Sequence, residues 1–578
     1  MHSSLKFNRE FIRQFWTLFR PFWQSDERYI AFGLFILSVF GTVGSVIAIV
    51  GLNQFQKEFY DALASFNQPA LLQSLTHFLG WLVFIILCYG YGNYFQTRLS
   101  LKWRKWLTHD YLRQYFHNQA YYHLQQQGSV VDNPDQRLSD DLSAFTSLSL
   151  NIFFALLSAV MTLGSFLTIL WNLSGNFQFH VFNDQYSIPG YLCWCALIYA
   201  VIGTYLMNRL GIQLPILNYH QQKLSAHFRY GLVRLRENSE QIAFFSGESF
   251  ENKKLKAIFE SVYDNGIKIA LLHRRLSFFR NAYNNVSSVV GILFTMPMYL
   301  SKKIVLGTLM QISSAFGEVL NGFSVFINSF DLIREWQAVV VRIAELHEKM
   351  IDAHLNSEQM LRLKPQQGGG LELKNFNLCN SHGEILLKDL HLVLKPGDGL
   401  LIQGPSGIGK TTLFRALAGL WPHAYGDYWS EPSHEVLFLS QRSYLPIGTL
   451  KEAIIYPSHA ELSDEQAALA LEQVGLSRLT SYLHDTQAWS HTLSLGEQQL
   501  LTFTRIYLMT PKIVYLDEAT SAMDEQLEHE IYQKLREWNP NLIIISIGHR
   551  GSLKRHHSRT LILGDQEQVA LEVPCHEL

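Results

Sequence analysis

Long apolar runs dominate the first 340 residues of the chain. Four of them, at residues 29–52, 75–95, 145–173 and 190–210, contain few charged residues. A helix of ~20 such residues is long enough to cross a ~30 Å hydrocarbon layer. Two further runs, at residues 284–300 and 305–330, are interrupted by serine, asparagine and glycine, as in helices that face a cavity or one another. Any single run could be a buried core helix, but six together predict an all-α transmembrane domain of six helices.

The charged segments between these runs indicate the orientation of the spans. Lysine and arginine are frequent at residues 98–137 and 223–256, whereas residues 171–191 contain neither. Because positive loops stay in the cytoplasm, we expect the two basic segments to be cytoplasmic, with Lys302 and Lys303 as a minor opposing signal. Their helical spacing predicts that the spans continue beyond the membrane as rods. Residues 1–28 mix basic and aromatic side chains and predict an amphipathic helix on the cytoplasmic surface rather than a signal peptide.

The pattern changes near residue 365. A charged helical stretch ends at the sequence Pro-Gln-Gln-Gly-Gly-Gly of residues 365–370, and short apolar runs then alternate with helical stretches. This alternation is typical of an α/β domain. We therefore predict a transmembrane domain at residues 29–345, a linker at 346–370 and an α/β domain at 371–578.

Composition agrees with a membrane protein. The 578 residues are 48% hydrophobic and only 17% charged. The net charge of −2 gives no basic field of the kind that binds nucleic acid, so we expect no nucleic-acid partner. The five cysteines are scattered, without the spacing of a zinc site or a disulfide framework.

A phosphate-binding loop is the clearest chemical motif. The pattern G-x-x-x-x-G-K-[ST] lies between a strand-like run at 399–403 and a helix-like run at 412–418. Its glycines let backbone N–H groups turn toward phosphates, and the following helix directs its positive end at them. Lys410 is expected to reach the outer phosphates, and the Thr411 hydroxyl to bind Mg²⁺. A glycine-rich turn before an ordinary helix is the alternative. The loop consists of Gly404, Pro405, Ser406, Gly407, Ile408, Gly409, Lys410 and Thr411.

Two carboxylates follow the apolar strand predicted at residues 513–516. Asp517 would lie at the carboxyl end of this strand, where α/β sheets bind ligands, and fits a magnesium partner. Glu518 is placed to polarise the water that attacks the γ-phosphate, because phosphoryl transfer depends on positioning and charge stabilisation. By itself, a strand followed by Asp-Glu is equally consistent with a surface turn.

The stretch Leu-Ser-Leu-Gly-Glu-Gln-Gln at residues 493–499 resembles the signature sequence of ATP-binding cassette proteins, although Leu495 and Glu497 depart from the usual Leu-Ser-Gly-Gly-Gln. Other elements follow in the order of that family. Gln441 resembles the glutamine of the Q-loop, residues 521–524 resemble the D-loop, and His549 resembles the switch histidine. A lone histidine after an apolar strand is more often structural, so its interpretation depends on the other motifs.

The resemblance implies an ATPase that binds ATP and Mg²⁺, with two cassettes packed head to tail. Since one chain carries one cassette, a homodimer follows, in which Ser494 of one copy completes the site containing Lys410 of the other. The implied catalytic residues are Glu518, His549 and Gln441, and the implied magnesium ligands are Thr411, Gln441 and Asp517. The implied nucleotide contacts are the phosphate-binding loop with Thr412, Ser494, Gly496 and Asp524. The aromatic residue that usually stacks on adenine aligns near Asn380, with Phe376 as a nearby candidate.

Six spans before the cassette resemble the exporter-type membrane fold. Residues 132–137, 237–248 and 420–422 look like the subgroup of peroxisomal acyl-CoA transporters and bacterial relatives of the peptide (SbmA/BacA) and cobalamin uptake proteins. The resemblance implies a multi-pass inner-membrane transporter, in contact with lipid, that moves peptides, cobalamin or similar solutes, with uptake favoured over efflux. Transport of fatty acids, acyl-CoA or lipid is the alternative. A membrane-anchored ATPase that regulates a partner protein is a third hypothesis, against which six spans argue.

Overall fold

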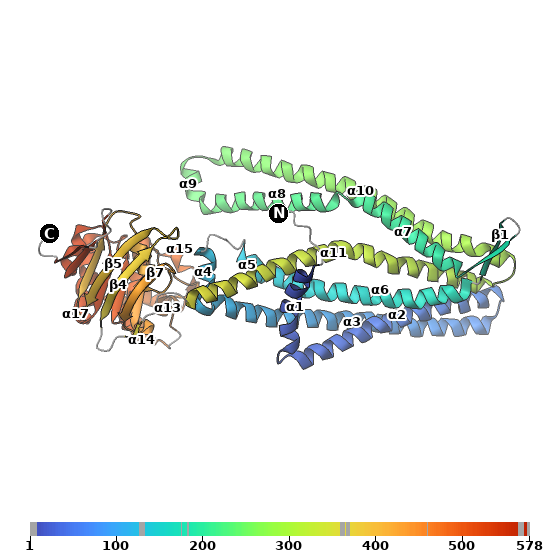
Figure 1. The fold of residues 1–578 in the computed structure, drawn as a ribbon, viewed down its shortest axis with the longest axis horizontal. Helices are drawn as coiled ribbons and strands as arrows, with labels where there is room; N and C mark the ends of the chain where they lie inside the picture. The colour runs from blue at the N-terminus through green and yellow to red at the C-terminus, as the bar shows by residue number, and fades with distance from the viewer. Residues whose placement is uncertain are drawn as a thin grey trace. The chain divides into compact units, whose positions relative to one another are not determined.

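The computed structural model describes residues 8–126, 133–174, 176–181, 184–358, 364–365, 370–458, 461–564 and 571–574. The chain divides into two compact units. The first comprises Met1–Tyr115 with Val131–Lys349, and the second comprises Phe116–Val130 with Met350–Leu578. Figure 1 shows the first as long helices and the second as an α/β unit. The helices of the first unit and the α/β fold of the second agree with the predicted fold class, a six-helix transmembrane domain of exporter type followed by an α/β nucleotide-binding domain.

Long helices make up the first unit. Among the described residues, four helical stretches are long and apolar enough to cross a membrane, namely Arg28–Ala64, Gln68–Gln125, Pro134–Ser174 and Tyr191–Glu237. They contain the first four predicted spans, and α10 and α11 contain the weaker fifth and sixth. The helices are α1 (Arg9–Gln24), α2 (Arg28–Ala64), α3 (Gln68–Phe116), α6 (Leu142–Ser174), α7 (Tyr191–Gly211), α8 (Leu214–Glu237), α9 (Ser239–Phe244), α10 (Glu248–Leu300) and α11 (Leu306–Glu358), with short α4 (Ala120–Gln126) and α5 (Pro134–Gln136) between α3 and α6.

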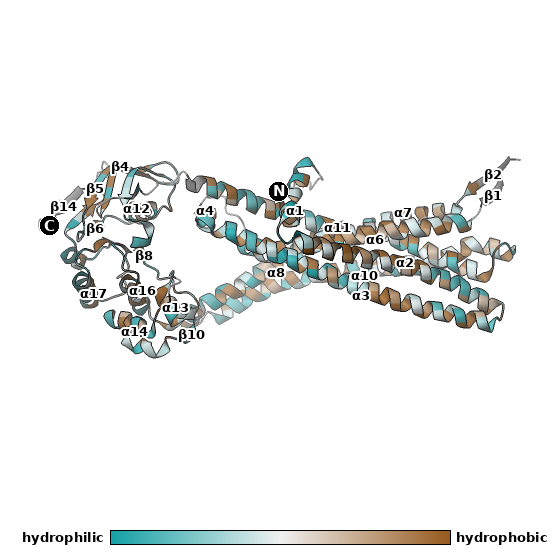
Figure 2. Ribbon diagram, turned by 90° about the horizontal axis from the view of Figure 1, so that it is seen from below, coloured by the Kyte–Doolittle hydropathy of each residue, from teal (hydrophilic) through white to brown (hydrophobic). Residues whose placement is uncertain are grey.

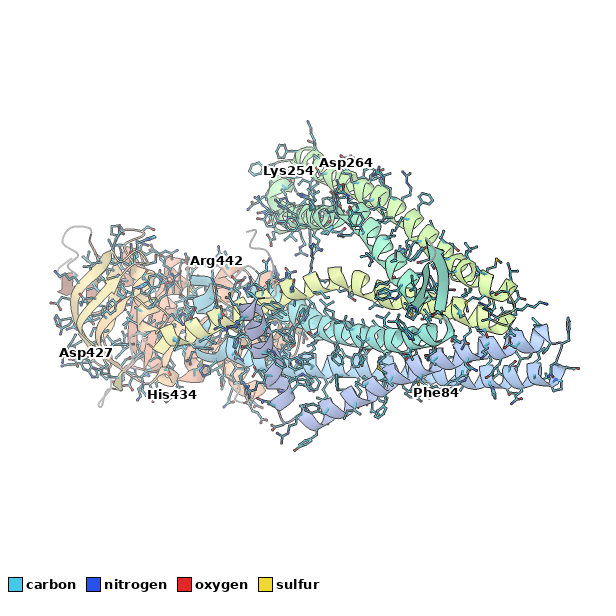
Figure 3. The ribbon with its side chains drawn as sticks, turned by 45° about the vertical axis from the view of Figure 1, so that its right-hand side comes forward. Phe84, Lys254, Asp264, Asp427, His434 and Arg442 are labelled. Carbon is cyan, nitrogen blue, oxygen red and sulfur yellow. The ribbon has the colours of Figure 1, made fainter. Side chains whose placement is uncertain are left out.

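Several of these helices are much longer than a membrane is thick. Helix α3 has 49 residues, and α10 and α11 have 53 each, which at 1.5 Å per residue is about 75–80 Å. Figure 2 shows apolar residues concentrated along the halves of α2, α6 and α7 toward the β1–β2 end, and Phe84 of α3, labelled in Figure 3, is 40% exposed. The helices therefore continue as rods, as predicted.

Helix α1 is amphipathic and packs on the bundle through an aromatic face. The Asn8 side chain accepts a hydrogen bond from the Phe11 N–H at 2.9 Å and so caps its first turn. Phe22 is fully buried and stacks on Trp103 of α3, with ring centroids 5.6 Å apart. Phe11 contacts Trp336 of α11 edge-on at 5.4 Å. Residues 1–7 of the predicted segment lie outside the described residues.

Polar contacts join α2 to the start of α11. The Asn53 side-chain amide donates to the Gln311 carbonyl at 2.9 Å, and the Gln311 amide donates to Gln54 Oε1 at 3.1 Å. Asp61 accepts a hydrogen bond from the Gly307 N–H at 2.8 Å. Asn53 and Gln311 are 2% and 6% exposed, and within the described part of the chain the side-chain oxygen of each has no hydrogen-bond partner. This junction is buried, and two of its polar side-chain atoms lack a hydrogen-bond partner among the described residues.

A β-hairpin precedes α7. Strands β1 (Asn176–Val181) and β2 (Asp184–Pro189) are antiparallel, with Phe177 opposite Ile188. The sequence of this segment lacks lysine and arginine, and no strand was predicted there.

The second unit is built on a largely parallel sheet in the order β14-β13-β6-β12-β11-β8. Every residue of β12 is buried, as are the first four residues of β6 and β11, which explains why these strands are continuous apolar runs rather than alternating patterns. Strand β14 pairs antiparallel with β13 at one edge. The strands are β6 (Gly399–Gln403), β8 (Val436–Leu439), β11 (Ile513–Asp517), β12 (Ile543–Ile547), β13 (Arg559–Ile562) and β14 (Leu571–Pro574).

A second sheet has the order β3-β7-β4-β5. Its strand β3 and the last turns of α11 both fall inside the predicted linker 346–370, and residues 366–369 of the predicted break lie outside the described residues. The exact domain boundaries stay a prediction. The strands are β3 (Lys364–Pro365), β4 (Leu371–Cys379), β5 (Ile385–Leu394) and β7 (Ala424–Ser430), with the pair β9 (Gly448–Thr449) and β10 (Thr486–Gln487) apart from both sheets. The helices are α12 (Lys410–Leu417), α13 (Leu450–Ile455), α14 (Asp464–Gln473), α15 (Trp489–Thr492), α16 (Leu495–Met509) and α17 (Glu525–Trp538).

Candidate functional site

The phosphate-binding loop lies between β6 and α12, as its flanking sequence predicts. Gly404, Gly407 and Gly409 have φ values of 153°, 87° and 106°, which favour glycine. At Gly404 a Cβ atom would also lie 2.6 Å from the Leu563 carbonyl oxygen, so no other residue fits there. The loop ends where α12 begins at Lys410, and the N-terminus of a helix attracts anions.

Lys410 lies within this loop and is 7% exposed. Its ammonium donates to the carbonyl oxygens of Gly404 at 2.7 Å and Pro405 at 2.8 Å. Burial lowers the pKa of Lys410, and the nearby carboxylates of Glu518 and Asp517 oppose that shift. Two loop carbonyls thus hold the ammonium close to the N-terminus of α12, and these two positive groups suit phosphate oxygens.

Asp517 ends strand β11, and Glu518 follows it. The Thr411 hydroxyl donates to Asp517 Oδ1 across a long 3.5 Å contact. Burial raises the pKa of Asp517, while the hydroxyl of Thr411 opposes the rise. A hydroxyl and a carboxylate that face each other beside the phosphate-binding loop fit Mg²⁺, which prefers oxygen ligands.

Glu518 is held between the two other predicted catalytic residues. Gln441 Nε2 donates to Glu518 Oε2 at 2.8 Å, and His549 Nε2 lies 3.6 Å from Glu518 Oε1. The Glu518 backbone has φ of 49°, a left-handed conformation that is uncommon for a residue with a side chain, and its N–H bonds to the Ile547 carbonyl at 3.1 Å. The fold therefore brings Gln441, Glu518 and His549 together.

The predicted signature opens helix α16. Ser494 is its N-cap, and Ser494 and Glu497 form a reciprocal capping box, with the Ser494 N–H donating to Glu497 Oε2 at 2.9 Å. The Ser494 N–H, the Ser494 hydroxyl and Arg478 lower the pKa of Glu497. The unusual Glu497 thus fixes the start of this helix. Gly496 packs against the D-loop, since a Cβ there would lie 3.2 Å from the Ala522 carbonyl oxygen.

Asp524 and the two residues considered for the adenine contact, Phe376 and Asn380, lie in different surroundings. Asp524 caps α17 by accepting a hydrogen bond from the Leu527 N–H at 2.7 Å. Phe376 of β4 is fully buried in the hydrophobic core, so the expectation that it could stack on adenine is wrong. Asn380 lies in the β4–β5 turn, where its side-chain oxygen accepts from the backbone N–H groups of His382 and Glu384, each at 2.9 Å.

Two residues to which the sequence assigned no role also contact these loops. Gln499 of α16 bonds to the Q-loop and the D-loop, and Arg550, next to His549, donates to two D-loop carbonyl groups. No spacing rule marks either residue. Gln499 is the last residue of the signature stretch and Arg550 directly follows His549, and these positions were the only signal.

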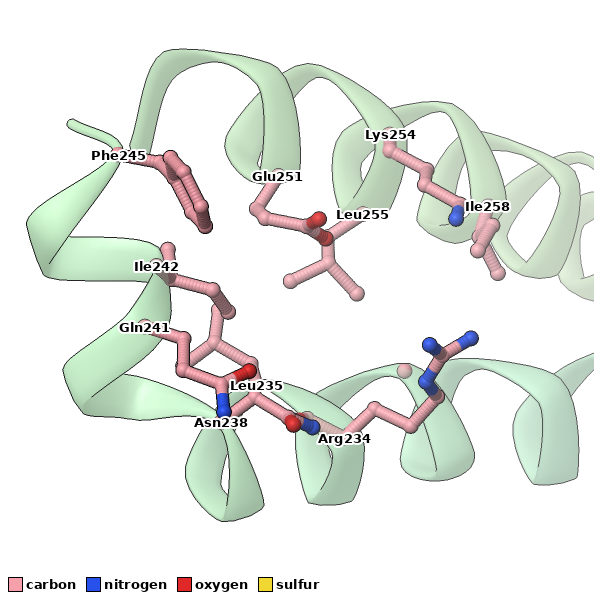
Figure 4. Close-up of a pocket in the computed structure, with 11 residues that line it drawn as sticks. Arg234, Leu235, Asn238, Gln241, Ile242, Phe245, Glu251, Lys254, Leu255 and Ile258 are labelled. Atoms are coloured by element: carbon pink, nitrogen blue, oxygen red, sulfur yellow. The ribbon is translucent and has the colours of Figure 1, made fainter. Parts of the chain in front are cut away.

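The two subgroup motifs of the helical unit have structural roles. Arg137 is 6% exposed and donates to the Arg342 carbonyl at 2.9 Å and to Glu345 at 3.0 Å. Asp132, at the start of that motif, lies outside the described residues. In the second motif, Asn238 and Gln241 line a cavity of about 250 Å³ between α8, α9 and α10. Figure 4 shows Arg234 of α8 and Lys254 of α10 pointing into the space between these helices.

Comparison with known proteins gives two family matches. The family described as ABC transporter transmembrane region 2 matches residues 17–300, and the family described as ABC transporter matches residues 387–521.

Several relatives match nearly the whole chain. ABC transporter D family member 2, chloroplastic, of Arabidopsis thaliana is 32% identical, over 95% of this chain and 85% of its own length. The inner membrane ABC transporter ATP-binding protein YddA of Escherichia coli is 30% identical, over 94% of this chain and 96% of its own. The human lysosomal cobalamin transporter ABCD4 is 28% identical, over 97% and 95%.

A solved structure shows the same fold. It is a bacterial Atm1-family ABC exporter with ATP bound, and it superposes with a TM-score of 0.75 at 17% identity, covering 96% of this chain and 97% of the other.

Proposed function

The chain belongs to the ABC transporter family, with relatives in the D subfamily. From this membership we propose that two copies of the chain form a homodimer and that the homodimer imports peptides, corrinoids or similar solutes. A transmembrane region fused to an ATP-binding region makes the protein an ATPase coupled to transport. The inner membrane is the proposed location, as for the YddA relative.

The observation that carries the proposal is the placement of Glu518 between Gln441 and His549 at the end of β11. In this arrangement Glu518 orients the water that attacks the γ-phosphate and accepts a proton from it. His549 holds the Glu518 carboxylate in position. Lys410 and the backbone N–H groups of its loop bind the phosphates. Thr411 and Asp517, together with Gln441 as the family resemblance implies, would hold Mg²⁺, which neutralises charge on the phosphates.

A homodimer is proposed because each chain carries one cassette. In the family, two cassettes face each other, so Ser494, Gly496 and Asp524 of one copy are proposed to complete the nucleotide site of the second. ATP then favours the closed pair, and hydrolysis releases it. The different affinity of the two states for ATP is what shifts the membrane helices between their arrangements.

The proposed substrate class rests on two observations. The human relative that spans 97% of this chain is named a cobalamin transporter. In addition, Asn281, Asn284 and Asn285 of α10 are exposed in the chain, next to the apolar segment of that helix. Exposed amides in a membrane-proximal helix suit a polar or amphipathic solute better than a hydrocarbon chain.

The test uses the purified full-length protein in lipid nanodiscs and proteoliposomes. We expect cobalamin or a cationic peptide to stimulate ATP hydrolysis and to cross the bilayer in the presence of ATP. The variant Glu518→Gln should bind ATP and abolish uptake. Stimulation by acyl-CoA alone would contradict the proposed substrate class. Solute movement unaffected by Glu518→Gln, together with an ATP-dependent change in a bound partner protein, would contradict transport itself.

A further inference from the structure

Glu518 is one of four residues of the second unit that are joined in a closed ring of hydrogen bonds. Gln441 donates its side-chain amide to Glu518 Oε2 at 2.8 Å, and the Ser521 N–H donates to the Glu518 carbonyl at 3.0 Å. Gln499 closes the ring, because its single Nε2 donates both to the Gln441 carbonyl and to Ser521 Oγ, each at 3.2 Å. The Q-loop, the D-loop and the signature helix α16 therefore meet at one amide.

Both polar atoms of the Gln499 side chain, Nε2 and Oε1, have hydrogen-bond partners. Gln499 is 4% exposed, and its Oε1 accepts from the Ala522 N–H at 3.0 Å. A buried amide that is fully paired is held in one orientation, because each alternative leaves a polar group unsatisfied. Movement of either loop therefore breaks a bond to Gln499 or moves α16 with it.

Arg550 holds the same D-loop through two further hydrogen bonds. Its Nη1 donates to the Met523 carbonyl at 2.6 Å and its Nη2 to the Ser521 carbonyl at 2.9 Å. The fully buried Glu528 supports this arrangement, since it accepts from Thr520 Oγ1 at 2.7 Å and lies 3.7 Å from Arg550 Nη1. His549 faces Glu518, and Arg550, the next residue, holds Ser521. The two contacts therefore come from one short segment of the chain.

We propose that Gln499 and Arg550 are positioning residues for ATP hydrolysis, which together fix the D-loop and thereby the orientation of the Glu518 carboxylate. The proposal rests on the proposed catalytic role of Glu518. Glu518 has a left-handed backbone conformation, which persists only where surrounding contacts impose it. Its carbonyl is held by Ser521, and Ser521 is held by both Gln499 and Arg550. Loss of either contact releases the carboxylate that must face the attacking water.

The experiment measures the steady-state ATPase activity of the full-length protein in nanodiscs. For Arg550→Met and Gln499→Met we expect kcat to fall by about 10²-fold, as for a misplacement of about 1 Å, with the KM for ATP changed by less than about threefold. Arg550→Lys should recover part of kcat, since one ammonium can reach one carbonyl but cannot bridge two as a guanidinium does.

Arg536 provides a matched control. Its guanidinium also donates to backbone carbonyls of this unit, those of Gly397 at 2.9 Å and Leu542 at 2.7 Å. These carbonyls lie next to the amino ends of β6 and β12, whereas Glu518 follows the carboxyl end of a strand. Arg536→Met should lower the melting temperature at least as much as Arg550→Met and leave kcat unchanged. If kcat falls equally in both variants, or if the KM rises while kcat holds, Arg550 has no positioning role.

A second readout separates this proposal from the role of Glu518. In single-turnover hydrolysis, Arg550→Met should not slow the residual rate of Glu518→Gln further, because both changes act through one carboxylate. A further fall of about 10²-fold in that background would overturn the proposal. If Glu518→Gln hydrolyses ATP like the wild type, the catalytic role of Glu518 fails first. If Glu518→Gln is inactive and Arg550→Met retains full kcat, the positioning role alone fails.

Discussion

Replacing Phe22 by alanine tests how firmly α1 is attached to the helical unit. The Phe22 ring is fully buried, stacks on Trp103 at 5.6 Å and contacts Trp106 at 6.0 Å. Removing a buried phenylalanine costs about 3–5 kcal/mol from lost burial and the cavity left behind, and stacked ring pairs contribute about 0.5–1.5 kcal/mol of that. This is large beside a total stability of about 5–15 kcal/mol for a folded domain.

Trp16 on the same helix is the matched control, because its side chain is 53% exposed. We expect Phe22→Ala to raise the rate of hydrogen exchange in α1 and to lower the melting temperature of the protein in nanodiscs, followed by tryptophan fluorescence. Trp16→Ala should change the stability by less than about 1 kcal/mol. Equal shifts in the two variants, or unchanged exchange of α1 amides in Phe22→Ala, would refute the argument that α1 is held by its buried aromatic face.

Three further predictions concern the cassette. Burial lowers the pKa of His557 to about 4, whereas an unfolded histidine titrates near 6.5, so only the unfolded state binds this proton between those values. Stability should therefore fall by about 3 kcal/mol as the pH falls from about 6.5 to about 4, and urea unfolding of His557→Gln should lack this slope. Gly404→Ala places a Cβ 2.6 Å from the Leu563 carbonyl and should abolish binding of a fluorescent ATP analogue, whereas Gly564→Ala, with open space around it, should not. Mg²⁺ removal by EDTA should stop hydrolysis in the wild type, and Asp517→Asn should raise the Mg²⁺ concentration needed for half-maximal activity.

The parts of the fold that the sequence predicted are those specified by local pattern. The six helices follow from the length of apolar runs, and β6, β11 and β12 from continuous buried runs between loops. The phosphate-binding loop was identifiable because glycine spacing, Lys410 and the flanking strand and helix all specify one conformation. Glu518 was a candidate because it follows a buried strand at the edge of the sheet where ligands bind, and because the signature, Q-loop and switch-histidine motifs accompany it in the order of the family.

Other features depend on which way a side chain points after the helices pack. Gln498 and Gln499 are adjacent and identical in type, but Gln498 bonds back to the carbonyls of Ser490 and Leu493, whereas Gln499 reaches Gln441. Phe376 was a reasonable candidate for adenine by its position in the chain, but the alternation of β4 turns its ring into the core. The tertiary packing, and not any local pattern, decides such orientations.

The junction of α2 with α11 has a consequence for a protein whose membrane helices change their arrangement. Asn53 and Gln311 are joined by hydrogen bonds through their nitrogens, while their two side-chain oxygens are buried and unpaired within the described part of the chain. If α2 and α11 separate during transport, water would solvate both oxygens, and that gain would offset much of what the broken hydrogen bonds lose. Such a junction would open at low cost, and its specific hydrogen bonds would restore the same register on closing.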